Sequence, residues 1–203
     1  MARIKICGLR FDEDIDYANE LLPEYVGFVF WNRSKRYITP EEAGRLRARL
    51  DPKIKTVGVF VDEDITVVED LLKRGIIKIA QLHGDEGEAY IQRIKADMQC
   101  KIMKAFKVKS ADDIIAANNS HADMVLLDSG MGTGETFDWS LIKSVNRPYF
   151  LAGGLTPENV GKAIEELDPF AVDASSSLET DGRKDRQKIK TFIDEVRKER
   201  NHE

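Results

Sequence analysis

Residues 148–177 read PYFLAGGLTPENVGKAIEELDPFAVDASSS, and this stretch shows the pattern on which the predicted fold rests. It contains two short apolar runs, at residues 148–152 and 170–174, which are almost continuous rather than alternating. Such runs are typical of parallel strands that are buried on both faces. Between them, residues 156–159 read Thr-Pro-Glu-Asn, which places a capping Thr, a first-turn Pro and an acid at the start of a helix. The stretch therefore predicts a strand, a crossover helix and a second, parallel strand.

The rest of the chain repeats this pattern. Strand-like runs start at intervals of roughly 21 to 30 residues, as expected for successive βα units. The eight runs lie at residues 3–7, 25–30, 55–61, 76–82, 101–108, 124–128, 148–152 and 170–174. Further helix starts are readable at residues 39–42 and 110–113, and a last amphipathic helix is expected from Arg186 to about Arg200.

Eight βα units in about 200 residues match the lower size limit of a (β/α)8 barrel. An open doubly wound sheet is the alternative, but such a sheet usually has fewer strands. No linker, low-complexity tract or change in composition divides the chain. The predicted fold is therefore of the α/β class, a single (β/α)8 TIM-barrel domain over residues 1–203.

The composition excludes several classes of protein. Hydrophobic residues make up 42% of the chain, enough for one sizeable core and too many for a disordered protein. The net charge is −5 and no basic block stands out, so we expect no nucleic-acid partner. Neither a signal peptide nor an apolar run of roughly 20 residues is visible, so we expect a cytoplasmic protein with no membrane partner. Two cysteines, Cys7 and Cys100, are too few for a disulfide framework or a four-ligand zinc site.

In a (β/α)8 barrel the catalytic groups lie at the C-terminal ends of the strands. Cys7 ends the first predicted strand, where it is either a small core residue or a thiolate base or nucleophile. Asp128 ends the sixth, and a carboxylate is costly to bury after an apolar run unless it has a purpose. The glycine-rich loop after Asp128 would let the backbone approach a ligand closely. We therefore take the end of the sixth strand as a candidate site.

Three other strand ends leave alternatives open. The basic loop at residues 33–36 is either solvated or supplies an arginine that holds a carboxylate bidentately. His83 is either a structural hydrogen-bonding residue or a ligand contact, and no neighbouring His or Cys supports a metal site. Lys104 and Lys107, on the fifth strand, face outward or supply a Schiff-base nucleophile, as in an aldolase-like barrel.

The last two strand ends favour an anion. Gly153 and Gly154 follow the seventh strand, and Ser175, Ser176 and Ser177 follow the eighth. Small residues at these two places, with a short helix after Ser175, are typical of the phosphate site of such barrels.

Eight motifs, in this order across nearly the whole chain, resemble the phosphoribosylanthranilate isomerase family of tryptophan biosynthesis. They are KICG (5–8), GFVFWNRSKRY (27–37), VGVFV (57–61), QLHGDE (81–86), LLDS (126–129), GTGETFDW (132–139), LAGGLTPENV (151–160) and VDASSSLE (172–179). That family converts N-(5-phosphoribosyl)anthranilate into 1-(2-carboxyphenylamino)-1-deoxyribulose 5-phosphate, an Amadori rearrangement that needs no cofactor. The resemblance implies the same small-molecule substrate for this chain, as a monomer or a homodimer.

The resemblance also implies roles for individual residues. It places the general base on Cys7, the general acid on Asp128 and the contact for the anthranilate carboxylate on Arg36. It places the phosphate on the Gly153-Gly154 turn and on Ser175, Ser176 and Ser177. Substrate contacts are also expected from His83 and from Gly132 in the glycine-rich loop.

The chain departs from the family pattern at two positions. Ser177 stands where the family usually has Gly, which is tolerable if a backbone N–H makes the contact and φ is not positive. Glu135 stands where the family commonly has Lys, which removes a cation near the barrel mouth. The remaining alternative is a phosphate-binding barrel without chemistry, against which Cys7, Asp128 and Arg36 all argue.

The expected chemistry sets demands on both titrating groups. Asp128 has to deliver a proton to the ring oxygen, for which burial would raise its pKa usefully. Cys7 has to act as a thiolate, although at an ordinary pKa only a few per cent of a thiol is ionised at pH 7. Lys5, two residues earlier on the same strand, would help if it faces the thiol.

Overall fold

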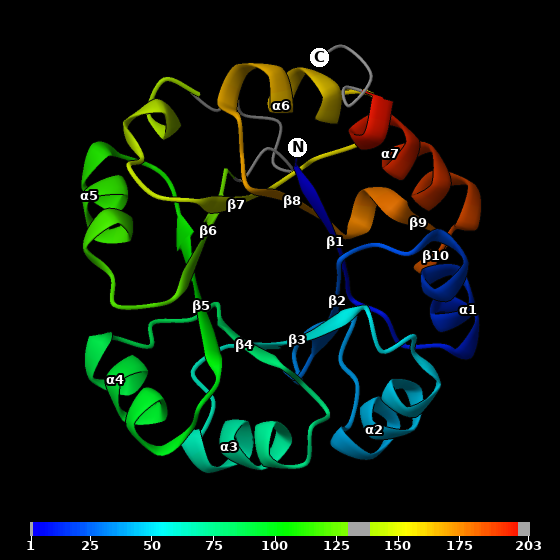
Figure 1. Ribbon diagram of the computed structural model, residues 1–203, viewed down its shortest axis with the longest axis horizontal. Helices are drawn as coiled ribbons and strands as arrows, with labels where there is room; N and C mark the ends of the chain where they lie inside the picture. The colour runs from blue at the N-terminus through cyan, green and yellow to red at the C-terminus, as the bar shows by residue number, and fades with distance from the viewer. Residues whose placement is uncertain (1, 130–138, 199–203) are drawn as a thin grey trace.

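Eight parallel strands close into a barrel in the computed structural model, which describes residues 2–129 and 139–198 (Figure 1). The strands are β1 (Arg3–Cys7), β2 (Tyr25–Val29), β3 (Lys55–Phe60), β4 (Ile79–Leu82), β5 (Lys101–Lys107), β6 (Met124–Asp128), β7 (Tyr149–Ala152) and β8 (Ala171–Ala174). Each strand pairs with its neighbour in sequence, and β1 pairs with β8 to close the ring, with Lys5 in register with Asp173. The predicted (β/α)8 fold is confirmed.

Seven described α-helices surround the strands in Figure 1. They are α1 (Asp12–Leu21), α2 (Pro40–Arg49), α3 (Ile65–Lys73), α4 (Glu88–Asp97), α5 (Ala111–Asn119), α6 (Val160–Leu167) and α7 (Arg186–Lys198). Thr39 caps α2 as expected, since its side chain accepts from the N–H of Glu42 and the Glu42 carboxylate accepts from the N–H of Thr39. The connection from β6 to β7 differs from the repeated βα pattern, because its described part, residues 139–148, holds only the 3-10 turn η2 (Ile142–Ser144).

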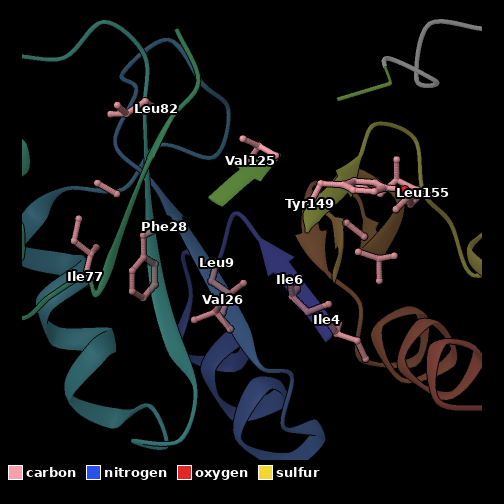
Figure 2. Close-up of a cluster of buried hydrophobic side chains, with 14 of the residues drawn as sticks. Ile4, Ile6, Leu9, Val26, Phe28, Ile77, Leu82, Val125, Tyr149 and Leu155 are labelled. Carbon is pink, nitrogen blue, oxygen red and sulfur yellow. The ribbon is translucent and has the colours of Figure 1, made fainter. Parts of the chain in front are cut away.

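The core has two parts, which follow from the alternation of side chains along each strand. Residues that point outward pack against the helices, and Figure 2 shows part of this outer cluster, including Ile4 and Ile6 of β1 with Val26 and Phe28 of β2. Residues that point inward fill the barrel, where Tyr25, Met103 and Phe150 share a second cluster. Because both faces are apolar, the strands read as continuous runs in the sequence.

The predicted fourth strand began too early. Residues 76–78 precede β4, and the apolar pair Ile76 and Ile77 completes the end of α3 instead. Gly75 has φ +68°, and the N–H groups of Ile76 and Gly75 donate to the carbonyls of Leu71 and Leu72. This is a Schellman motif, in which an apolar residue after the glycine packs back on the helix.

A small hairpin follows β8. The chain passes through the 3-10 turn η3 (Ser176–Leu178) into β9 (Glu179–Thr180) and β10 (Arg183–Lys184), which pair antiparallel. The two turn residues, Asp181 and Gly182, both have positive φ, as a tight two-residue hairpin turn requires. The hairpin brings residues that follow the eighth strand back to the barrel mouth.

Candidate active site

A cavity of about 230 Å³ lies at the C-terminal ends of the strands. Most of the residues that the sequence singled out line it, namely Cys7, His83, Asp128, Gly153, Gly154, Ser175, Ser176 and Ser177. A wider hollow of about 700 Å³ lies at the opposite end of the barrel, beside Arg3 and Pro148. Barrel enzymes carry their chemistry at the C-terminal end, so the smaller cavity is the candidate active site.

The side chain of Lys5 lies below Cys7 inside the barrel. Both residues occupy the inward face of β1, since alternate residues of a strand share a face. Lys5 is completely buried, its ammonium donates to the Asp173 carboxylate of β8 at 2.6 Å, and Cys7 lies near enough to raise the pKa of Lys5. Lys5 therefore faces the thiol, which the sequence had left undecided.

Burial and charge oppose each other at these groups. Burial raises the pKa of Cys7 above its usual range, and the Lys5 ammonium offsets only part of this effect. For Lys5, burial lowers the pKa, but the attraction of Asp173 and Cys7 outweighs it, so the pKa is raised and the ammonium stays charged. Cys7 is therefore a thiol of raised pKa with a permanent cation beneath it, rather than a thiol of lowered pKa.

Asp128 lies across the barrel mouth from Cys7, on β6, with 26% of its side chain exposed. Its Oδ2 is 3.5 Å from Nε2 of His83, which follows β4. The other ring nitrogen of His83, Nδ1, is 3.0 Å from the side-chain amide nitrogen of Gln81. Since that amide can only donate, Nδ1 accepts and the ring proton lies on Nε2, facing Asp128.

Two further groups in the cavity were missed at the sequence level. Asp173 Oδ1 and Gln81 Oε1 are buried acceptors that have no hydrogen-bond partner among the described residues, although both side chains line the cavity. Buried polar atoms in native structures nearly always have partners, so these two oxygens are suited to hydroxyl groups of a ligand. Both residues point inward because side chains alternate along a strand, and this alternation could have identified them from the sequence.

The backbone at the ends of β7 and β8 suits an anion. Gly153 and Gly154 have φ of +94° and +66°, a region that favours glycine, and the N–H of Gly154 donates to no residue that the structure describes. The hydroxyls of Ser175 and Ser177 donate to the carbonyls of Cys7 and Leu155. Their side chains are thus engaged, which leaves backbone N–H groups as the donors for a ligand.

Ser177 stands where the family usually has glycine, a change that is tolerable only if φ at this position is not positive. It lies within η3, and it is not among the described residues with positive φ. A side chain is therefore tolerated at this position. Gly132 and Glu135, by contrast, lie outside the described residues.

Arg36 does not line the cavity. Its aliphatic part lies against Gly8, the residue after Cys7, where an added Cβ would come within 2.5 Å of Arg36 Cδ. Its guanidinium donates through Nε and Nη2 to the two carboxylate oxygens of Glu179, each at 2.7 Å. Lys184 Nζ donates to the same carboxylate at 2.8 Å and to the carbonyl of Ser175 at 3.0 Å.

Neither candidate Schiff-base lysine reaches the cavity. Lys104 lies on the opposite face of β5 from the inward-pointing Met103, and its ammonium donates to the carbonyl of Gly84 at 2.6 Å. Lys107 is exposed at the end of β5. Among the described residues that line the cavity, none is a lysine.

No cluster of three or more potential metal ligands occurs within residues 2–129 and 139–198. In the same part of the chain, no helix is long and apolar enough to cross a membrane.

The fold and the site define a (β/α)8 barrel that gathers titratable side chains and backbone N–H groups at its C-terminal mouth, as barrel enzymes for small phosphorylated substrates do. The family model for N-(5'-phosphoribosyl)anthranilate isomerase matches residues 4–195. The chain therefore belongs to this family of tryptophan-biosynthesis isomerases.

Relatives of the same name match over nearly their whole length. The isomerase of Clostridium acetobutylicum is 46% identical, over 98% of this chain and 99% of the relative. The isomerase of Thermoanaerobacter pseudethanolicus is 44% identical, over 97% and 98%.

Solved structures agree with this assignment. The phosphoribosylanthranilate isomerase of Thermotoga maritima has a TM-score of 0.89 and 40% identity, over 98% of this chain and all of that chain. A second structure, with a TM-score of 0.87, 40% identity and the same coverage of 98% and 100%, is a complex with reduced 1-(o-carboxyphenylamino)-1-deoxyribulose 5-phosphate. The Thermotoga maritima isomerase is described as dimeric.

Proposed function

We propose that this chain catalyses the Amadori rearrangement of N-(5'-phosphoribosyl)anthranilate, with Asp128 as general acid and Cys7 as general base. The observation that carries the proposal is that both residues line one cavity from different walls, within a chain of this family. β1 and β6 are not neighbours in the barrel, so a substrate between them meets the acid on one side and the base on the other.

The first step opens the aminofuranose ring. Asp128 gives its proton to the ring oxygen, the bond from that oxygen to C1′ breaks, and the nitrogen lone pair forms a protonated Schiff base with C1′. The carboxylate that remains lies 3.5 Å from His83 Nε2, whose N–H stabilises the negative charge. His83 is thus proposed to stabilise the carboxylate of Asp128, and its contact with the substrate stays a prediction.

The second step removes the C2′ proton, which the cationic Schiff base has made acidic. The Cys7 thiolate takes this proton, and the enolamine then tautomerises to the aminoketone as C1′ gains a proton. The Lys5 ammonium supports the thiolate electrostatically, because it stays charged one layer below Cys7. The protons balance over both steps, because the ring oxygen and C1′ each gain one while C2′ and its enol hydroxyl each lose one.

The two charged ends of the substrate fix its orientation. Gly153, Gly154 and the segment Ser175, Ser176 and Ser177 hold the phosphate through backbone N–H groups, beside η3. Arg36 holds the anthranilate carboxylate from the edge of the mouth, where it lies against Gly8. The ribose hydroxyls then lie near the unpartnered oxygens of Asp173 and Gln81.

We further propose the phosphoribosyl compound as the chain's small-molecule partner and the cytoplasm as its place of work. The relative solved with the reduced product analogue supports the first, and the biosynthetic role of the family supports the second. Sedimentation of the purified protein decides between monomer and homodimer.

The proposal is tested by adding purified protein to freshly made N-(5'-phosphoribosyl)anthranilate and following the anthranilate fluorescence, with the product identified by mass. Wild type and Cys100→Ser should convert the substrate, whereas Cys7→Ser should lose most turnover. Equal activity of the two serine variants would remove Cys7 from the mechanism. Binding without turnover by the wild type would favour a barrel that binds phosphate compounds without chemistry. A borohydride-trapped lysine adduct would favour the aldolase-like alternative.

A further inference from the structure

The hairpin of β9 and β10 places Glu179 and Lys184 as a directly opposed cross-strand pair. Its Asp181-Gly182 turn fixes this register, because two residues of positive φ allow only a tight two-residue connection. Two outside contacts hold the hairpin on the barrel, since Arg10 donates to the carbonyl of Gly182 at 2.9 Å and Lys188 donates to that of Glu179 at 2.7 Å. The position of the Glu179 carboxylate is thus set by the fold.

Buried charge surrounds this carboxylate. Glu179 is 10% exposed and the Lys184 side chain only 1%, yet Lys184 donates both to Glu179 and to the carbonyl of Ser175 in the cavity wall. A buried ammonium is costly unless it is paired and hydrogen-bonded, so Lys184 keeps Glu179 ionised and in place. Glu179 in turn is the partner of Arg36 in a two-bond fork.

The fork uses only one edge of the guanidinium. Arginine has five N–H donors, and Glu179 takes the Nε donor and one Nη2 donor. The second Nη2 donor and both Nη1 donors remain, and no hydrogen bond of Nη1 occurs among the described residues. These remaining donors form a second edge, which matches the geometry of another carboxylate.

We propose that Glu179, held by Lys184, is the positioning residue that turns the free Nη1–Nη2 edge of Arg36 toward the carboxylate of the substrate. This inference rests on the proposed function, because it takes Arg36 as the contact for that carboxylate. Glu179 does not touch the substrate. It fixes the guanidinium plane before binding, so that less side-chain entropy is lost when the substrate is held.

The test compares two stable ligands by calorimetry. One is reduced 1-(o-carboxyphenylamino)-1-deoxyribulose 5-phosphate, and the other is the same compound without the ring carboxylate. The quantity measured is the ratio of their Kd values, which isolates the carboxylate contact from phosphate and ribose contacts. We expect the wild type to prefer the carboxylate compound about 100-fold, and Arg36→Met to lose nearly all of this preference.

Glu179→Gln keeps the size of the side chain but removes its charge. It should lose about tenfold of the preference while binding the carboxylate-free compound as the wild type does. With the natural substrate, KM should rise about tenfold and kcat should change less than about twofold. Glu179→Asp, which keeps the charge but is one methylene shorter, should shift the preference in the same direction and serves if the Gln variant folds poorly.

Glu20→Gln is the matched control. Glu20 also accepts from Nε and Nη2 of an arginine, Arg186, but this pair is exposed, between α1 and α7. Loss of this exposed ion pair should leave the preference for the carboxylate ligand unchanged. If Glu179 variants keep the wild-type preference, or weaken both ligands equally, the positioning role is wrong. If Arg36→Met keeps the preference, the proposed contact of Arg36 is wrong, whatever Glu179 does.

Discussion

The Lys5 ammonium lies 2.6 Å from the Asp173 carboxylate, inside the barrel and one layer below the Cys7 thiol. β1 and β8 bring the two residues into register, so the closure of the barrel itself creates the pair. Because Lys5 is completely buried, the cation beneath the thiol is not screened by solvent as a surface lysine would be. Lys5 therefore limits how far burial raises the pKa of the proposed base.

Lys5→Met should raise the pKa of Cys7 further, because burial already raises it and the Lys5 ammonium is what opposes that effect. Alkylation by iodoacetamide measures the thiolate directly, and it should be followed against pH in a Cys100→Ser background. The midpoint should move to higher pH than in the Lys5 parent protein, and turnover at neutral pH should fall about tenfold for each pH unit of this shift.

An unchanged midpoint would show that Lys5 does not act on the thiol. Removing Lys5 also leaves Asp173 buried without its cation, which is destabilising. Thermal unfolding should therefore be recorded beside the alkylation, so that loss of fold is distinguished from loss of thiolate.

Gly27→Ala should disturb Cys7 directly. A Cβ at Gly27 would lie 2.7 Å from Cys7 Sγ and 3.2 Å from Cys7 Cα, so the thiol has to move. We expect a loss of about 1–3 kcal/mol in the free energy of unfolding, measured in urea, together with a clear loss of kcat. Gly44→Ala in α2 is the control, since its Cβ would meet only the Ile76 side chain, at 3.4 Å and beyond, and it should be neutral or stabilising. Full activity of Gly27→Ala would argue against a fixed thiol position.

Gly154→Ala should weaken phosphate binding. Gly154 has φ +66°, so a side chain there strains the backbone and displaces the proposed N–H donor. We expect KM to rise about tenfold or more, with inorganic phosphate losing its ability to compete. Gly75→Ala imposes the same strain at φ +68°, at the end of α3 rather than in the cavity. It should lower stability similarly and leave KM unchanged, whereas equal KM values for both variants would contradict the phosphate site.

Glu179 should make stability depend on acid pH. Burial raises its pKa, but Arg36 and Lys184 outweigh this effect and lower the pKa from 4.5 to about 2. A lowered carboxyl pKa stabilises the fold above pH 4.5, and this contribution is lost as the pH falls toward 2. The wild type should therefore exceed Glu179→Gln by about 3 kcal/mol in unfolding free energy at pH 7, and by much less near pH 2. A difference that does not depend on pH would place the effect in packing.

The barrel itself was predictable because its strands are buried on both faces and so stand out as continuous apolar runs. The first and last residues of the strands were harder to predict. Ile76 and Ile77 show why, because apolar residues at the end of a helix give the same sequence pattern as the start of an apolar strand. Strand alternation places Lys5 on the face of Cys7, which is a local property that the sequence contains.

The contact between Arg36 and Glu179 could not be found in this way. It joins residues 143 positions apart, and the register of the β9–β10 hairpin decides it. The Asp181-Gly182 turn signal was present in the sequence, but it carries no information about where the hairpin docks.

Turnover of Asp128→Asn beside the wild type, followed by the decay of anthranilate fluorescence with N-(5'-phosphoribosyl)anthranilate, shows whether Asp128 is the general acid. The amide keeps the shape of the side chain but has no acidic proton, so kcat should fall about 10²- to 10⁴-fold while the reduced product analogue still binds. If Asp128→Asn turns over within about tenfold of the wild type, Asp128 is not the general acid and the acid–base account is wrong.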